Sequence, residues 1–324
     1  METKFVSIII PCRNEEKYIE KCLNSVISQD YPKENFEILV IDGASEDKTK
    51  EIVKNYIAKY SFIQILDNPN KFTPFGLNIG IRASKGKIII RMDAHAGYEK
   101  DYISKCAKYL GEYNADNVGG VIKTLPANDT LEAKAISISL SHPFGAASGF
   151  RLGLQTPKEV DTVFGGCYKR EVFDKIGFYN ENLTRSQDLE LNLRLSKAGG
   201  KIMLFPDIVA YYYPSSDFEG FFKHNFSDGF WVTYPLKFGI HAFSSRHLIP
   251  MVFVLGLIFS FLLFPKSIFL FIFFIYLFAS LYFSLKVFQK EKNSKYLILL
   301  PLAFACRHFG YGIGSIAGLI RTLF

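Results

Sequence analysis

An acid and an imidazole stand two positions apart at the end of a strongly apolar run. The run Lys87-Ile-Ile-Ile-Arg-Met has the composition of a buried strand, and Asp93 and His95 follow it directly. Residues i and i+2 of an extended chain point to the same side, so both side chains can reach one metal ion. A hard cation with few protein ligands takes the rest from phosphate and water. The spacing therefore predicts a metal-held diphosphate, although Asp93 could instead only cap the next helix.

A second acid lies in a leucine-rich segment that runs from Arg185 to Leu195. A helix that begins at Ser186 or Gln187 places Asp188 in its first turn, where the helix N-terminus stabilises an ionised carboxylate. Such a carboxylate, if it faces a pocket, can take a proton from an acceptor hydroxyl. The alternative is that Asp188 interacts only with the helix dipole.

Segments of strand and helix character that alternate along the chain must position these groups. The expected strands cover residues 5–11, 36–42, 62–66, 87–92, a stretch from 116, 160–168 and 201–205. Such alternation with short turns implies a parallel sheet with right-handed crossovers. Gly165 and Gly166 would bend the strand over 160–168, so that a ligand can approach the backbone. The small residues of 143–151 are typical of a mobile lid.

Polar side chains follow four of the expected strands. They are Pro11 with Arg13, then Asp42, then Asn68, then Asp93. The carboxyl ends of parallel strands meet at one edge of the sheet, which is where open α/β folds hold their ligands. The chain has no Gly-x-Gly-x-x-Gly or Walker loop, which disfavours dinucleotide and P-loop chemistry. Asp42 could accept a hydrogen bond from a base or a ribose hydroxyl, or could only cap a helix.

The composition is too apolar for an ordinary soluble enzyme. The 324 residues are 49% hydrophobic and 16% aromatic, with a mean hydropathy of +0.12, yet 21% are charged. A net charge of +7 without an arginine-aromatic array suits anionic lipid better than nucleic acid, so no nucleic-acid partner is expected. The five cysteines are scattered and form no Cys-x-x-Cys pair, which argues against disulfides and zinc.

The apolar residues are concentrated at the C-terminal end of the chain. We expect a cytosolic α/β domain at 1–214, amphipathic interface helices with a broad aromatic face at 215–246, and membrane helices at 247–324. The membrane segments fall at about 248–264, 267–287 and 296–323. The basic loop 290–295 predicts a multi-pass protein of the cell membrane whose catalytic domain lies in the cytosol. Arg307 and His308 in the third segment could contact a lipid diphosphate, or could lie at the interface in a re-entrant hairpin.

A series of short motifs runs through nearly the whole chain. They are Ser7 to Pro11 with Arg13-Asn-Glu-Glu, Asp42-Gly-Ala-Ser, Leu77-Asn-Ile-Gly-Ile, Arg91-Met-Asp-Ala-His95, Asn117-Val-Gly-Gly, Val160-Asp-Thr-Val-Phe-Gly, Gln187-Asp188 with Glu190-Leu-Asn and Arg194-Leu, Arg246-His-Leu-Ile-Pro, and Arg307-His-Phe-Gly-Tyr-Gly-Ile-Gly. Each is weak alone, but their order and spacing resemble family 2 glycosyltransferases. More narrowly, they resemble the succinoglycan-biosynthesis ExoA-like branch.

The resemblance implies a GT-A fold, a nucleotide-diphosphate sugar donor, a Mn²⁺ or Mg²⁺ ion, and inversion at the anomeric carbon. By position, Asp93 and His95 match the metal motif, which is Asp-x-Asp in the wider family, and Asp188 matches the catalytic base. The residues expected on the donor nucleotide are Pro11, Arg13, Glu15, Asp42, Asn68, Arg91 and Asp93.

The acceptor side is assigned from the resemblance and from the membrane segments. The residues expected there are Gln187, His224, Trp231, Arg307 and His308. Related sequences carry a Gln-x-x-Arg-Trp-like motif on the interface helix. This chain has His224-Asn-Phe-Ser-Asp-Gly-Phe-Trp231 instead, and so lacks the arginine. That departure disfavours processive polymerisation.

The expected function is that of an inverting, membrane-bound glycosyltransferase. It would move a sugar to a polyprenyl-diphosphate-linked glycan acceptor in exopolysaccharide or cell-surface glycan assembly. One alternative is a polyprenyl-phosphate glycosyltransferase, whose phosphate nucleophile is already ionised and needs no base. A non-enzymatic alternative is a membrane scaffold that binds a sugar nucleotide. A polymerising synthase is disfavoured because three membrane segments are few for a channel.

Overall fold

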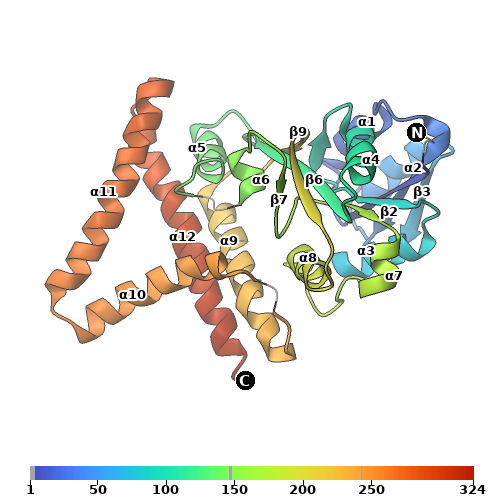
Figure 1. Ribbon diagram of the computed structural model, residues 1–324. Helices are drawn as coiled ribbons and strands as arrows, with labels where there is room; N and C mark the ends of the chain where they lie inside the picture. Colours follow the sequence, from blue (N-terminus) through green and yellow to red (C-terminus); the bar gives the residue numbers. More distant parts are fainter. Residues whose placement is uncertain (1–3, 146–147, 242) are drawn as a thin grey trace. The chain divides into compact units, whose positions relative to one another are not determined.

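The computed structural model describes residues 4–145, 148–241 and 243–324, and its chain forms two compact units (Figure 1). The sheet unit comprises Met1–Lys123 and Gly153–Tyr212, and the helical unit comprises Thr124–Leu152 and Tyr213–Phe324. The chain thus leaves the sheet unit at residue 124 and returns to it at residue 153. The predicted lid segment, 143–151, belongs to the helical unit, and its residues 146–147 lie outside the described ranges.

The sheet unit is built on one mixed sheet. Its strands are β1 Val6–Cys12, β2 Phe36–Asp42, β3 Ile63–Asp67, β4 Ile88–Arg91, β5 Ala96–Tyr98, β6 Asn117–Thr124, β7 Lys158–Glu159, β8 Cys167–Lys169 and β9 Ile202–Tyr212. They pair in the order β3-β2-β1-β4-β8-β6-β9-β5, and β7 also pairs with β9. The predicted parallel sheet is confirmed for β1 to β4. The pairs β4–β8, β6–β8, β5–β9 and β7–β9 are antiparallel.

Helices cover both faces of the parallel strands. The helices of the sheet unit include α1 Ile19–Ile27, α2 Thr49–Ile57, α3 Thr73–Ala83, α4 Tyr102–Glu112, α7 Glu171–Ile176 and α8 Gln187–Lys197, of which α4 and α7 pack against the antiparallel strands. Ile8 and Ile10 of β1 are fully buried in one core with Leu23 of α1. Ile9 points to the opposite face, where a Cβ on Gly80 of α3 would lie 2.5 Å from its Cγ2 atom. This alternation is the strand period of two, with both faces covered as in other parallel sheets.

The prediction of one strand over 160–168 is wrong for most of its length. Only Cys167–Lys169 is extended, because Gly165 and Gly166 adopt φ angles of +68° and +95°. These positive angles fold the chain against the end of β4, where the Arg91 N–H donates to the Gly166 carbonyl at 3.0 Å. A Cβ at Gly165 would lie 2.8 Å from the Arg91 carbonyl oxygen, so a larger residue does not fit there.

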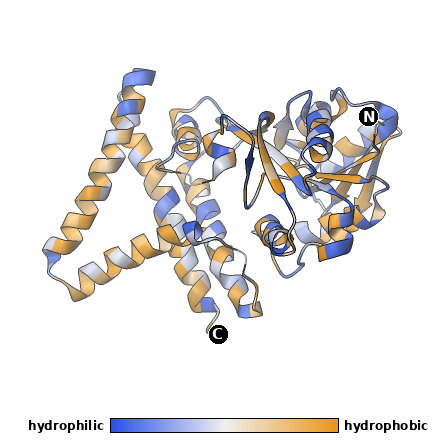
Figure 2. Cartoon of the chain, viewed as in Figure 1, coloured by the Kyte–Doolittle hydropathy of each residue, from blue (hydrophilic) through white to orange (hydrophobic). Residues whose placement is uncertain are grey.

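The helical unit contains three helices long and apolar enough to cross a membrane. These segments are Ser245–Leu263, which includes α10 Ile249–Leu263, then α11 Lys266–Glu291 and α12 Tyr296–Arg321. They agree with the predicted membrane segments to within a few residues. Figure 2 shows them as hydrophobic along most of their length. The unit also contains α5 Leu131–Leu140, α6 Gly149–Leu152 and α9 Phe218–Thr233.

Glycines make the contact between α9 and α12. The third apolar segment is one continuous helix, despite Pro301 and several glycines. A Cβ on Gly229 of α9 would lie 2.0 Å from the Tyr311 carbonyl oxygen, and a Cβ on Gly314 of α12 would lie 2.0 Å from that of Phe226. Small residues allow helix backbones to approach this closely, which is a common device between membrane helices. The predicted aromatic interface helix, α9, therefore packs against α12 at Gly229 and Gly314.

Candidate functional site

Two loops at the carboxyl ends of β1 and β2 are joined by reciprocal hydrogen bonds. The Asn14 N–H donates to Ser45 Oγ at 2.9 Å, and the Glu46 N–H donates to Asn14 Oδ1 at 2.9 Å. Glu16 makes the same kind of exchange, with its N–H on Asp47 Oδ2 and its Oε2 accepting from the Lys48 N–H, each at 3.1 Å. Between these pairs, the Glu15 N–H donates to Thr49 Oγ1 at 2.8 Å. The backbone around Glu15 is therefore held in place on both sides.

The predicted metal residues lie directly beyond β4. Asp93 is fixed through its backbone, because its N–H donates to the Tyr98 hydroxyl at 2.7 Å. His95 Nδ1 lies 3.2 Å from Glu15 Oε1, and the His95 side chain is 40% exposed. Burial alone would lower the pKa of His95, but the hydrogen bond that its ring donates to Glu15 and the charge of Asp93 outweigh burial and raise the pKa. The carboxylates thus favour a protonated Nδ1.

One buried guanidinium joins the two acids that the sequence singles out. The Arg91 NH2 group donates to Asp93 Oδ1 at 2.7 Å, and its NH1 group forms an ion pair with Asp188 Oδ2. Burial would lower the pKa of Arg91, but the charge of Asp93 leads the interactions that raise it, so the guanidinium stays charged. The structure therefore brings the predicted metal ligand and the predicted base to the same side chain.

Asp188 lies in the first turn of α8, as its sequence position predicts. Ser186 precedes the helix in the left-handed region, with φ of 60°, and turns the chain so that α8 starts at Gln187. The Asp188 side chain is 26% exposed. This first-turn position favours the ionised carboxylate, and the Arg91 ion pair favours it further.

Buried polar atoms without a hydrogen-bond partner gather among the predicted site residues. Within the described residues, they include Asp42 Oδ1, Asn68 Oδ1, Arg91 Nε, Gln187 Oε1 and Asp188 Oδ1. Leaving such an atom unpaired costs about 1–3 kcal/mol, so native proteins rarely do so without a reason. A polar ligand that pairs these atoms is a sufficient reason.

The remaining predicted donor residues lie at the same edge of the sheet. Asp42 is fully buried at the end of β2, where its Oδ2 accepts from the Ser45 N–H at 3.1 Å and lies 3.3 Å from Lys50 Nζ. Asn68 follows β3 and donates from Nδ2 to the Phe72 carbonyl at 2.9 Å. Arg13, just beyond β1, is exposed. These side chains surround the end of the parallel strands.

The residues predicted on the acceptor side, apart from Gln187, belong to the helical unit. His224 Nε2 lies 3.3 Å from Asp228 Oδ2 on α9. Arg307 donates from Nε to the Gly145 carbonyl at 2.5 Å and from NH1 to Asn225 Oδ1 at 2.6 Å.

His308 is engaged at both ring nitrogens in the same unit. Nε2 lies 2.8 Å from the Phe144 carbonyl oxygen, and Nδ1 lies 3.0 Å from the Tyr276 hydroxyl. Arg307 and His308 thus hold consecutive carbonyls of the segment that follows α5. Neither the predicted lipid contact nor the alternative re-entrant hairpin includes these carbonyl partners, because the 162 and 164 positions that separate them leave no local signal in the sequence.

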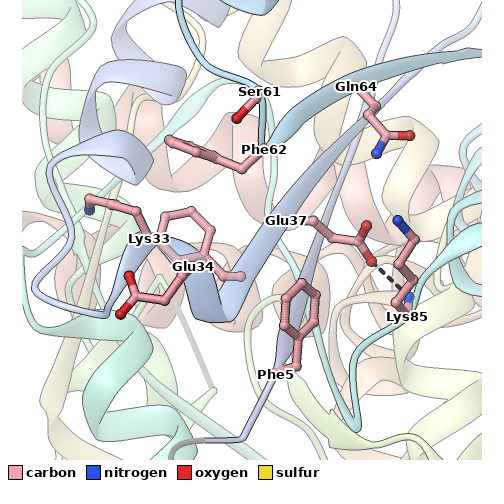
Figure 3. Close-up of a pocket in the computed structure, with 9 residues that line it drawn as sticks. Phe5, Lys33, Glu34, Glu37, Ser61, Phe62, Gln64 and Lys85 are labelled. Carbon is pink, nitrogen blue, oxygen red and sulfur yellow. Dashed lines mark hydrogen bonds between the residues drawn. The ribbon is translucent and has the colours of Figure 1, made fainter.

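A cavity of about 380 Å³ lies at the opposite edge of the parallel strands (Figure 3). Its lining comes from the first residues of β2 and β3, the segments just before β1, β2 and β3, and the segment just after α3. It comprises Phe5, Lys33, Glu34, Phe36, Glu37, Ser61, Phe62, Gln64 and Lys85. The Glu37 carboxylate in this cavity accepts from the Ser7 hydroxyl at 2.6 Å and from the Lys85 N–H at 2.7 Å. The Glu37 carboxylate therefore links β2 to β1 and to the segment that follows α3. No predicted site residue lines the cavity.

Comparison with known proteins agrees with this geometry. Residues 7–177 match the family model described as "Glycosyl transferase family 2". The chain belongs to glycosyl transferase family 2. This family 2 chain is 31% identical over 324 residues to a relative in Methanococcus voltae, covering 98% of each protein. That relative is named "Dolichyl N-acetyl-alpha-D-glucosaminyl phosphate 3-beta-D-2,3-diacetamido-2,3-dideoxy-beta-D-glucuronosyltransferase".

Two further comparisons bear on the predicted branch and fold. The glycosyltransferase is 26% identical over 232 residues to "Succinoglycan biosynthesis protein ExoA" of Rhizobium meliloti (strain 1021), covering 68% of this chain and 67% of the relative. Its fold resembles "Mannosyltransferase PcManGT from Pyrobaculum calidifontis in complex with GDP-Man and Mn2+", with a TM-score of 0.66 at 17% identity. That match covers 99% of this chain and 88% of the other. The predicted family and the predicted GT-A fold are confirmed.

Proposed function

We propose that this glycosyltransferase moves a sugar, with inversion, from a nucleotide-diphosphate sugar to a lipid-linked acceptor. The observation that carries the proposal is the Arg91 guanidinium, which holds the donor-side acid Asp93 and the base candidate Asp188 together. The unpaired buried atoms of Arg91, Gln187 and Asp188 support a polar ligand at this place. The fold neighbour that contains GDP-Man and Mn²⁺ supports a nucleotide-sugar donor.

Asp93 and His95 fit a divalent cation as a pair of ligands. Glu15 contacts His95 at Nδ1, which leaves Nε2 as the nitrogen for a metal. Among the described residues, no group of three or more His, Cys, Asp or Glu side chains is arranged to hold a metal ion. Two protein ligands are what a Mn²⁺ or Mg²⁺ ion needs when the nucleotide diphosphate and water complete its shell. When bound, the cation would neutralise the charge of the leaving diphosphate.

Asp188 is the general base in this proposal. Its carboxylate takes the proton of the acceptor hydroxyl while the oxygen attacks the sugar on the face opposite the diphosphate. A single displacement of this kind inverts the anomeric carbon. Arg91 keeps the carboxylate ionised and oriented before the acceptor arrives. We assign Gln187, which precedes Asp188 and carries an unpaired buried oxygen, to the acceptor side.

The helical unit supports an acceptor that resides in a membrane. Its three apolar helices could hold the protein there, and the relative in Methanococcus voltae is named for a dolichyl-linked substrate. We infer a polyprenyl-diphosphate-linked glycan as the acceptor, with His224, Trp231, Arg307 and His308 on its side. From the basic loop 290–295, which joins α11 to α12, we infer that the sheet unit lies on the cytosolic side of the cell membrane.

A donor panel tests the proposal directly. Purified full-length protein is incubated with Mn²⁺, a membrane lipid extract and UDP-, GDP- or dTDP-sugars, and the lipid fraction is read by mass spectrometry. We expect one donor class to add one sugar mass to a lipid-linked glycan. Excess EDTA should reduce the product at least about 100-fold, because the diphosphate then leaves without charge neutralisation, and added Mn²⁺ should restore it. Equal turnover in EDTA would rule out the metal.

The ion pair between Arg91 and Asp188 favours one second candidate. A carboxylate already paired with a guanidinium is a weaker base, whereas a polyprenyl phosphate is ionised and needs none. The product of that reaction would be a polyprenyl-phosphate sugar. Mild acid would release free sugar and polyprenyl phosphate from it. Release by mild acid of an oligosaccharide that carries the new sugar, with no free monosaccharide, would exclude this candidate.

A further inference from the structure

His95 stands where the wider family carries the second acid of its Asp-x-Asp motif. A carboxylate can bind a cation through either oxygen, so its orientation matters little. An imidazole offers one lone pair, and the nitrogen that carries it depends on the partner of the other nitrogen. An Asp-to-His exchange at this position therefore creates a need for a partner that sets the tautomer, and it also removes one negative charge.

Glu15 is the residue that the structure supplies for this need. Its Oε1 lies 3.2 Å from His95 Nδ1, across 80 positions of sequence. The Glu15 side chain is only 20% exposed. A carboxylate that accepts from Nδ1–H leaves the lone pair on Nε2, which is the arrangement found behind many metal-bound histidines.

The backbone of Glu15 is held by hydrogen bonds at both its N–H and its carbonyl. Its N–H donates to the hydroxyl of Thr49, a fully buried residue, at 2.8 Å. Its carbonyl accepts from the N–H groups of Tyr18 and Ile19, each at 2.9 Å, which starts α1. Thr49 is itself held by Asp47 through its N–H at 3.0 Å. The contact with His95 is therefore anchored in the β1–α1 and β2–α2 loops, unlike a surface pair between mobile side chains.

We propose that Glu15 is a positioning residue that holds His95 with Nε2 directed to the cation and restores the negative charge missing from the motif. This role rests on the proposed metal-dependent transfer. It is separate from the nucleotide contact expected of Glu15 from its sequence position. It also makes a specific prediction, because Glu15 should matter only while residue 95 is a histidine.

Mn²⁺ binding to the full-length protein in detergent tests this role. Binding is measured by electron paramagnetic resonance, with UDP and GDP as separate probes for the diphosphate. Glu15→Gln should weaken Mn²⁺ binding about 10- to 100-fold, the usual effect of losing such a supporting contact. His95→Asp should bind Mn²⁺, and Glu15→Gln in that background should change the affinity less than about twofold. Glu20→Gln, at an exposed position on α1, is the matched control.

A second measurement identifies the tautomer of the His95 imidazole in the absence of metal. Nitrogen-15 spectra of labelled histidine, with His95 assigned by His95→Gln, should show the Nδ1–H form in the unsubstituted protein. Glu15→Gln should shift the signal toward a mixture of tautomers. Glu15→Gln and His95→Gln should each keep the thermal unfolding midpoint of the unsubstituted protein to within a few degrees.

The possible results separate this role from the function on which it rests. Unchanged Mn²⁺ affinity in Glu15→Gln overturns the role while the metal site stands. An equal loss in the His95 and His95→Asp backgrounds also overturns it, because Glu15 would then only support the loop. If the unsubstituted protein binds no Mn²⁺ with either nucleotide, the metal-dependent function fails and this role fails with it.

Discussion

Asp188→Asn is expected to lower sugar transfer by about 10²- to 10⁴-fold, which is the usual contribution of a general base. Asn keeps the size of the side chain but cannot take the proton of an acceptor hydroxyl. The variant should still bind the donor, because the proposed donor contacts lie on Asp93 and the strand ends. Turnover is measured with the donor identified by the panel, and donor binding by isothermal titration with Mn²⁺ present.

The design of this experiment separates the base from the ion pair with Arg91. Asp174→Asn, at an exposed position on α7, is a control for the loss of one acid. Asp188→Glu keeps a carboxylate and should retain more activity than Asp188→Asn if proton transfer is the function. Full activity of Asp188→Asn would remove the base assignment. Together with a lipid product from which mild acid releases the free monosaccharide, it would favour the polyprenyl-phosphate candidate.

Gly314→Leu should prevent the helical unit from forming its packed arrangement. Even a Cβ at this position would lie 2.0 Å from the carbonyl oxygen of Phe226, a backbone atom that cannot move away as a side chain can. Overpacking a core commonly costs about 1–3 kcal/mol, and a clash with backbone exceeds the lower part of that range. We expect a thermal midpoint lower by about 10 °C or more in detergent, or an aggregated protein on size exclusion.

Gly256 on α10 provides the matched control for this substitution. A Cβ there meets no atom within 4 Å, so Gly256→Leu adds the same apolar bulk in the same class of helix without a clash. Leucine also has the better helix propensity, by close to 1 kcal/mol. Gly256→Leu should therefore be neutral or slightly stabilising. Equal midpoints for the two variants would show that close contact between α9 and α12 does not hold the unit together.

The parallel half of the sheet could be predicted because each strand is a short apolar run that ends in a polar residue. The strand character of β6 and of the start of β9 could be predicted too, but the antiparallel pairing of that half could not, because it depends on distant partners. β5 is three residues long and forms only against the end of β9. The stretch 160–168 has strand composition, yet the positive φ angles at Gly165 and Gly166 are dictated by the end of β4.

The candidate site, too, could be predicted only in part from the sequence. Asp93 and His95 could be paired because their two-residue spacing has a direct geometric meaning in an extended chain. Arg91 and Asp188 are 97 positions apart, and Glu15 and His95 are 80 apart, so no periodicity links them. For the same reason, no local signal in the sequence separates 124–152 from the predicted α/β domain at 1–214.

The excursion of 124–152 into the helical unit has a practical consequence for producing this enzyme. Cutting the chain after Tyr212 would remove α12 but keep α5, whose Ala135 packs in one cluster with Tyr296, Leu300 and Phe304. The shortened protein would expose to water the apolar surface of α5 that α12 covers, and we expect it to aggregate. A water-soluble version would need a short polar bridge from Lys123 to Gly153 as well as the new terminus. Because the chain crosses between the two units three times, neither unit of this protein can be exchanged between genes at a single junction.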